Sequence, residues 1–141
     1  MRTSGLILVV FATLFFCSCT TEKQKSLDGI WELASIQSKD SLGAWQQASW
    51  MKNGTGLLHY TTNGHMSVHF WPDTLFTPAQ EPYWYVAKYR LSLDTVFHTR
   101  VMHSIPTENL KTVPRLYRIK QDTLYLSAPD YGFKLTWIKK Q

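Results

Sequence analysis

Cysteine is scarce in this chain, and its placement excludes several kinds of chemistry. The 141 residues include two cysteines, Cys17 and Cys19, and none follows them. The chain beyond residue 19 therefore forms no internal disulfide and offers neither a thiol nucleophile nor a cysteine ligand for a metal. Its stability must come from a hydrophobic core, for which one domain of this length is large enough.

Acidic side chains are also few, with ten Asp and Glu against fifteen Lys and Arg. All except Glu32 fall in predicted turns, loops or the N-terminal segment, and Glu32 follows Trp31, so alternation along a strand points it outward. We therefore expect no carboxylate inside the fold. This excludes a paired-carboxylate glycosidase and a Ser-His-Asp triad, and the chain has no G-x-S-x-G nucleophile elbow.

Metal, nucleotide and nucleic-acid sites are not indicated either. His65 and His69 share a predicted strand face but lie ~13 Å apart, too far for one ion. His98 and His103 are expected on opposite faces of one strand. The net charge of +5 is spread along the chain without a basic run longer than two residues, and no glycine-rich phosphate loop is present. We expect no metal, no cofactor and no nucleic-acid partner.

The longest apolar run, residues 5–16, has twelve residues and follows Arg2. A helical span of a ~30 Å bilayer core needs about 20 residues, so this run predicts a signal segment instead. It ends at Cys17-Ser18-Cys19, which resembles a bacterial lipoprotein box. The resemblance implies a signal peptide over residues 1–18 and diacylglyceryl and palmitate-type acyl chains on Cys19. A polar tether over residues 19–26 would then hold the domain to a membrane of the cell envelope.

The rest of the chain shows a period of two in apolar residues, which is typical of half-buried strands. Residues 27–141 are predicted to form an all-β domain, an antiparallel up-and-down barrel of about eight strands. Asn63-Gly64 predicts a two-residue type I′ hairpin. Two long connections, residues 39–55 and 72–82, are either lids over the barrel mouth or plugs at its end. The predicted strands cover residues 30–37, 56–61, 66–71, 83–93, 96–104, 113–120, 123–127 and 133–139.

Alternation also predicts which side chains face the interior. The inward set is mostly apolar, and its polar members are the candidate ligand-binding residues: Arg115, His98, Tyr89, Tyr117 and Tyr60, with Arg100 as a further possibility. Met102, Leu91 and Leu93 are expected inside as well. A buried Arg without a partner is costly, so Arg115 must meet a protein acceptor, water or an anionic ligand. For residues 56–61 and 66–71, alternation leaves two alternatives for the inward face. One holds Leu58, Tyr60, Ser67, His69 and Trp71; the other holds Leu57, His59, Met66, Val68 and Phe70.

Gly29-Ile30-Trp31 matches the G-x-W motif that opens lipocalin barrels. Together with residues 56–68 and the ending Leu135-Thr136-Trp137-Ile138-Lys139, it resembles a bacterial lipocalin-like domain family of unassigned function. The resemblance implies that a cation from the last strand, here Lys139, packs on the Trp31 indole at the barrel base. The family's last strand more often ends in Arg, which stacks on an indole better than Lys.

These features predict a small apolar ligand, with or without a carboxylate, held inside a membrane-anchored barrel. An Arg flanked by tyrosines in an apolar cup resembles the carboxylate site of fatty-acid-binding barrels. Two alternatives stay open. One is a non-catalytic envelope protein whose filled barrel serves a structural or partner-binding role. The other is a cofactor-free isomerase or lyase that uses His98 beside Arg115 and Tyr89.

Overall fold

The computed structural model describes residues 26–72, 82–128 and 131–141. The predicted signal peptide, the Cys19 lipidation site and most of the predicted tether lie outside these residues. So do Leu75 and Phe76 of the second long connection. Among the described residues, no helix combines the length and the apolar character that a membrane crossing requires.

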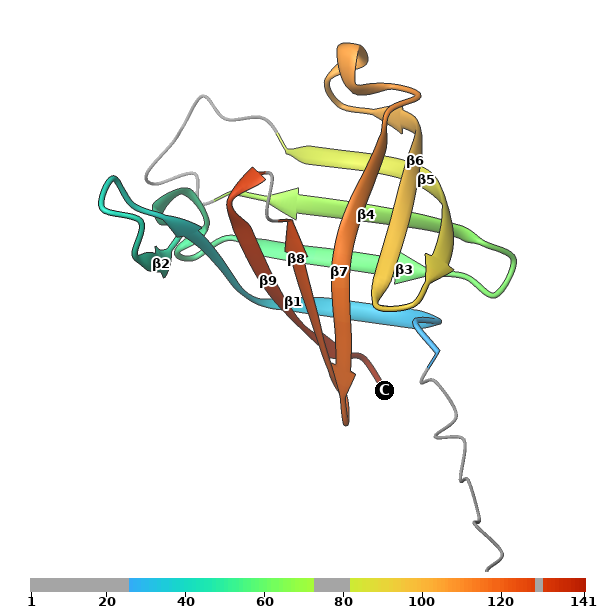
Figure 1. Cartoon of the computed structure of the whole chain (residues 1–141), viewed down its shortest axis with the longest axis horizontal. Helices are drawn as coiled ribbons and strands as arrows, with labels where there is room; N and C mark the ends of the chain where they lie inside the picture. Colours follow the sequence, from blue (N-terminus) through green and yellow to red (C-terminus); the bar gives the residue numbers. More distant parts are fainter. Residues whose placement is uncertain (1–25, 73–81, 129–130) are drawn as a thin grey trace, which may run out of the picture.

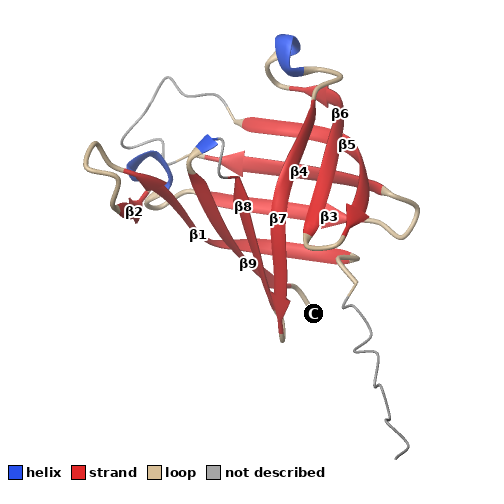
Figure 2. Cartoon of the chain, in the orientation of Figure 1, coloured by secondary structure: helices blue, strands red, loops and turns tan. Residues whose placement is uncertain are grey.

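Nine antiparallel strands form one sheet, and eight of them close into a barrel (Figures 1 and 2). Two single-turn 3₁₀ helices, η1 (Ser49–Met51) and η2 (Pro106–Glu108), lie in connections. Each strand pairs with the next along the chain, apart from the short β2, which is added to β1. The strands are β1 (Gly29–Lys39), β2 (Trp45–Gln47), β3 (Thr55–Tyr60), β4 (His65–Trp71), β5 (Tyr83–Ser92), β6 (Thr95–His103), β7 (Thr112–Lys120), β8 (Thr123–Ala128) and β9 (Phe133–Lys139).

The barrel closes where the first strand pairs with the last. The β1–β9 register runs from Trp31 opposite Lys139 to Ser38 opposite Phe133, with an irregularity between Leu33 and Ser35. Closure satisfies the backbone groups that an open sheet edge would leave unpaired. The predicted up-and-down barrel of about eight strands is confirmed.

The first long connection is partly structured, which periodicity did not predict. Three residues, Trp45–Gln47, pair with the end of β1 as β2, and the Asp40 carboxylate accepts hydrogen bonds from the Leu42 and Ala44 amides in the turn before it. After β2, Ala48 and Met51 are buried in the core. This connection therefore closes part of one barrel end.

The β3–β4 hairpin differs from the prediction by one residue. Tyr60 lies opposite Met66, and the Thr61 amide donates to the His65 carbonyl, so the loop has three residues and ends at Gly64, whose φ is +83°. Such loops carry a positive-φ residue in their last position, which Gly64 supplies. A one-residue difference in loop length exchanges the faces of one strand relative to the other. The buried face combines parts of both predicted alternatives: Gly56, Leu58, Tyr60, Met66, Val68 and Phe70.

Strand β6 contains a β-bulge that overturns two predictions. Ala87 pairs with Arg100 and Val86 pairs with Met102, which leaves Val101 as an extra residue. The bulge shifts the alternation, so Met102 is 56% exposed and His103 is buried. His98 and His103 therefore share the inner face, contrary to the prediction.

The end of β5 and its turn into β6 extend beyond the packed interior. Leu91 is 40% exposed and Leu93 is 89% exposed, so both predictions of an inward side chain were wrong. The alternation of side chains continues to the end of β5, but the packed interior of the barrel ends before the strand does. Five further residues predicted to face inward are buried: Val96, Val113, Leu124, Leu126 and Trp137.

Candidate functional site

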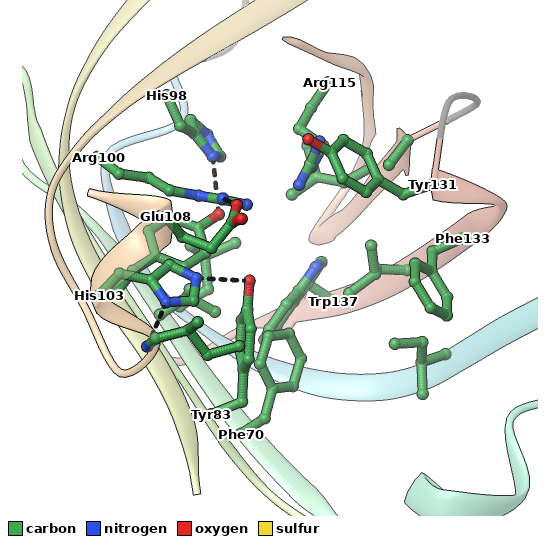
Figure 3. Close-up of a pocket in the computed structure, with 18 of the residues that line it drawn as sticks. Phe70, Tyr83, His98, Arg100, His103, Glu108, Arg115, Tyr131, Phe133 and Trp137 are labelled. Atoms are coloured by element: carbon green, nitrogen blue, oxygen red, sulfur yellow. Dashed lines mark hydrogen bonds and ion pairs between the residues drawn. The ribbon is translucent and has the colours of Figure 1, made fainter. Parts of the chain in front are cut away.

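The barrel holds a pocket of about 500 Å³ that opens at the end farthest from Trp31 and Lys139. Most of its lining is apolar or aromatic, and the polar groups gather on β5, β6, β7 and η2 (Figure 3). This volume lies within the ~300–1,000 Å³ range of small-molecule sites. The apolar lining includes Trp50, Phe70, Phe133, Leu135 and Trp137.

His98 on β6 is fully buried between two tyrosine hydroxyls. Its Nε2 is 2.7 Å from the Tyr60 hydroxyl, and its Nδ1 is 2.9 Å from the Tyr85 hydroxyl. Burial, with smaller contributions from the Arg115 and Arg100 charges, lowers the pKa of His98 to about 3. Burial also raises the pKa of Tyr85 to about 12 and that of Tyr60 well above its usual range. The three groups are therefore neutral at physiological pH.

A second histidine–tyrosine pair lies nearer the mouth. His103 Nε2 is 2.9 Å from the Tyr83 hydroxyl, and the Ile105 backbone amide donates to His103 Nδ1 at 2.8 Å. The His103 ring stacks on Tyr85, with centroids 5.6 Å apart and planes 1° apart. Burial and the Arg100 charge lower the pKa of His103, so it too is neutral at physiological pH. The β6 bulge is what brings this ring to the inner face.

Arg100 is the buried arginine of the described pocket, at 2% exposure. It forms an ion pair with Glu108 of η2, and Lys111 pairs with the other oxygen of that carboxylate. These partners lower the pKa of Glu108. The expectation that no carboxylate enters the barrel was therefore wrong. Glu108 lies in a loop, and its position at the pocket depends on how that loop folds back over β6.

Arg115 on β7 also lines the pocket but is only partly buried. Its Nη1 donates to the Pro114 carbonyl at 3.0 Å, and its guanidinium carbon lies 5.1 Å from the centre of the Tyr131 ring. Among the described residues Arg115 makes no ion pair with a carboxylate. It therefore offers a positive charge at the mouth without an anionic partner from that part of the chain.

Two buried donors in the lining have no hydrogen-bond acceptor within the described ranges: Arg100 Nε and Trp137 Nε1. Figure 3 shows both side chains bordering the same space. A buried polar group without a partner costs about 1–3 kcal/mol, so such groups in a pocket lining indicate a place for acceptor atoms.

The predicted site residues divide between the pocket and the packed base. His98 and Arg115 line the pocket, whereas Tyr60, Tyr89 and Tyr117 are not part of its lining. Tyr89 donates to the Thr61 carbonyl at 2.9 Å and packs edge-on against Tyr60. Tyr117 packs against the core.

At the base itself, Trp31 is 1% exposed and donates from Nε1 to the Leu27 carbonyl at 2.8 Å. Lys139 Nζ lies 5.2 Å from the centre of its ring, which is a cation–π contact.

Several lining residues were not among the sequence candidates. Tyr83 begins a strand, His103 follows a bulge that reverses its predicted face, and Glu108 lies in a loop, which has no alternation to give a face. Tyr85 was predicted to face inward, but nothing in the sequence indicated its bond to His98. Within the described ranges, no three His, Cys, Asp or Glu side chains are grouped closely enough to hold a metal ion.

Comparison with known proteins gives a partial likeness. No protein-family model matches the chain, and no curated protein matches it. A solved structure with a similar course is that of the lipoprotein YedD from Klebsiella pneumoniae. It is 11% identical, with a TM-score of 0.45, over 82% of this chain and 73% of that chain. The assignment of the fold here rests on the strand pairing of this protein itself.

Proposed function

We propose that this protein is a lipid-anchored protein of the bacterial cell envelope whose barrel binds a small, mainly apolar molecule through one polar head group. The observation that carries the proposal is a pair of buried donors, Arg100 Nε and Trp137 Nε1, in an apolar pocket of about 500 Å³, for which the described part of the chain supplies no acceptor. The apolar lining supplies affinity for a hydrocarbon body, and the donors supply a position for the head group.

The charges around the pocket favour a head group that carries negative charge. Arg100 and Arg115 contribute two positive charges, and Glu108 contributes one negative charge that already pairs with Arg100 and Lys111. The remaining positive charge lies at Arg115, beside the Tyr131 ring. An arginine at a partly desolvated mouth binds a carboxylate more strongly than it would in water.

Two features weigh against the other roles. A filled structural barrel would leave no room for a cavity of this size. For an isomerase or lyase, His98 would have to exchange protons, yet both of its ring nitrogens are bonded to tyrosine hydroxyls and its pKa is about 3. A general base is most effective with a pKa near the working pH. We therefore propose a binding protein rather than an enzyme.

The test uses a chain of residues 26–141, because every strand of the closed sheet lies between Gly29 and Lys139. Native mass spectrometry after exposure to a bacterial lipid extract and to dodecanoate should show one small molecule per chain. Arg115→Ala should weaken dodecanoate binding about tenfold or more, the effect of one charge-assisted hydrogen bond. Arg118→Ala is the matched control, since Arg118 lies on the same strand but on the outer face beside Tyr125. Retention of no molecule from either source would support the filled-barrel role instead.

A further inference from the structure

The His103–Tyr83 pair has its proton positions fixed by the backbone. A neutral imidazole carries one N–H and one acceptor nitrogen. Because the Ile105 amide donates to Nδ1, the His103 proton must be on Nε2, and it is donated to the Tyr83 oxygen. Tyr83 therefore accepts in this bond, and its own hydroxyl proton is left for another partner.

The proton positions of the His98 group follow from burial. One of its two tyrosines must donate to the ring and the other must accept from it. Tyr60 is 0% exposed, lies outside the pocket lining, and has His98 as its one hydrogen-bond partner among the described residues. If Tyr60 accepted, its own proton would be left unpaired in the core at a cost comparable to a lost hydrogen bond. Tyr60 therefore donates to Nε2, and His98 donates from Nδ1 to Tyr85.

Tyr85 is then in the same position as Tyr83. It accepts from a histidine, and its spare hydroxyl proton lies in the pocket lining. The two tyrosines are neighbours, with ring centroids 6.1 Å apart, and the Arg100 guanidinium lies 5.1 Å from the Tyr85 ring centre. The described lining thus holds at least four donors without an acceptor there: the Tyr83 and Tyr85 hydroxyls, Arg100 Nε and Trp137 Nε1.

We infer that His98 and His103 act as positioning residues that turn the Tyr83 and Tyr85 hydroxyls into donors toward the ligand, and that the head group they receive is a carboxylate bound as its anion. This inference rests on the proposed function, because it specifies the head group of the same pocket. A carboxylate only accepts hydrogen bonds, so it satisfies these donors without adding a proton that lacks an acceptor. An alcohol or an amine would bring a donor of its own, which the Tyr83 and Tyr85 hydroxyl protons, Arg100 Nε–H and Trp137 Nε1–H cannot accept.

The donor arrangement can be measured without any ligand. Nitrogen-15 NMR of the histidine rings at neutral pH distinguishes a protonated from an unprotonated ring nitrogen, and His98→Asn and His103→Asn assign the two signals by their loss. We expect opposite tautomers, with the proton on Nδ1 in His98 and on Nε2 in His103. A proton on Nε2 of His98 would overturn the inference, because the Tyr85 hydroxyl would then donate its proton to Nδ1 of the ring and have none left for a ligand.

The head-group class is tested with dodecanoate and dodecanol, which share one hydrocarbon chain. Dodecanoate should bind at least tenfold more tightly, and Tyr83→Phe and Tyr85→Phe should each weaken its binding about tenfold while changing dodecanol binding less. Tyr125→Phe, on the outer face, is the control and should change neither. Equal binding of the two probes, or dodecanoate binding that both variants leave intact, would refute the carboxylate assignment while leaving an apolar-ligand function standing. If neither probe binds the unmodified protein, the proposed function itself fails, and the tautomers still decide the donor arrangement.

Discussion

Lys139 lies directly opposite Trp31 across the seam between β1 and β9, with its Nζ 5.2 Å from the centre of the indole ring. The Cβ that an alanine would add at Gly29 would lie 2.9 Å from Lys139 Cε. Gly29 has a φ of +123°, which a residue with a side chain rarely adopts. The first glycine of the G-x-W motif thus leaves space for the cation that covers its tryptophan.

The base contact gives the first prediction. Lys139→Met should lower the free energy of unfolding by about 0.5–1 kcal/mol through loss of the cation–π contact, whereas Lys139→Arg should retain stability or increase it slightly. Urea denaturation measures both. Lys140→Met is the control, since Lys140 forms an exposed ion pair with Glu32. Equal losses for Lys139→Met and Lys139→Arg would show that the contact with Trp31 does not depend on the charge.

The hairpin register gives the second prediction. Leu58 is 1% exposed and lies opposite Val68, whereas its neighbour Leu57 is 39% exposed and lies opposite His69. Leu58→Ala should cost about 2–5 kcal/mol, and Leu57→Ala should change stability by about 0.5 kcal/mol or less. The same chemical change at adjacent positions therefore reports the register, and a larger loss at Leu57 would contradict it.

The third prediction concerns pH. The pKa of His98 is about 3 in the folded protein and 6.5 in its unperturbed state, so between these values the unfolded chain binds the additional proton. Stability from this group is therefore complete above about pH 6.5 and is lost as the pH falls toward 3. The loss should be about 1.4 kcal/mol per pH unit within that window.

Denaturation midpoints between pH 7 and pH 4.5 test this expectation, because most carboxyl groups titrate below that range. His98→Gln should flatten the profile, while His59→Gln, with an exposed side chain, should leave it unchanged. An NMR titration of the His98 ring gives an independent reading even if the Gln variant is unstable. Protonation of that ring above pH 5 in the folded protein would refute the prediction.

The fourth prediction concerns the anchor. Cys19→Ser in the full chain should abolish incorporation of labelled palmitate and move the protein from the membrane fraction to the soluble fraction. One acyl chain gives weak membrane binding and two give stable binding, so loss of lipidation should release the protein fully. Cys17→Ser is the matched control and should keep both properties. Labelling that survives Cys19→Ser and disappears in Cys17→Ser would move the lipidation site.

Sequence patterns predicted the barrel well because its strands are long, regular and bounded by turn residues. The inward faces of β7, β8 and β9 followed from alternation alone, as at Val113, Leu124 and Trp137. The failures occurred where one residue changes the alternation: the three-residue loop that ends at Gly64 and the bulge at Val101. Neither has a sequence signal strong enough to distinguish it from the regular alternative.

The candidate site was predicted less completely for the same reason. Alternation identified His98 and Arg115 as inward polar residues, but it does not give depth along the barrel, so Tyr60 and Tyr89 were assigned to a site when they pack at the base. Glu108 was missed because it reaches the pocket from a loop. Pairing between distant side chains, such as Tyr85 with His98, depends on a register that one sequence does not determine.

The two ends of the barrel also differ, because the seam between β1 and β9 begins at the closed end. Gly29 and Lys139, where the described barrel begins and ends, lie at one end, and the pocket opens at the other. Figure 1 shows β1 and β9 side by side along this seam. The segment from Cys19 to residue 25 can extend no more than about 25 Å. A protein anchored through Cys19 would thus hold its closed end toward the bilayer and its opening toward the aqueous compartment. If the proposed anchor and ligand both hold, a molecule would enter such a pocket from the aqueous side, through water or from another protein, and not directly from the bilayer.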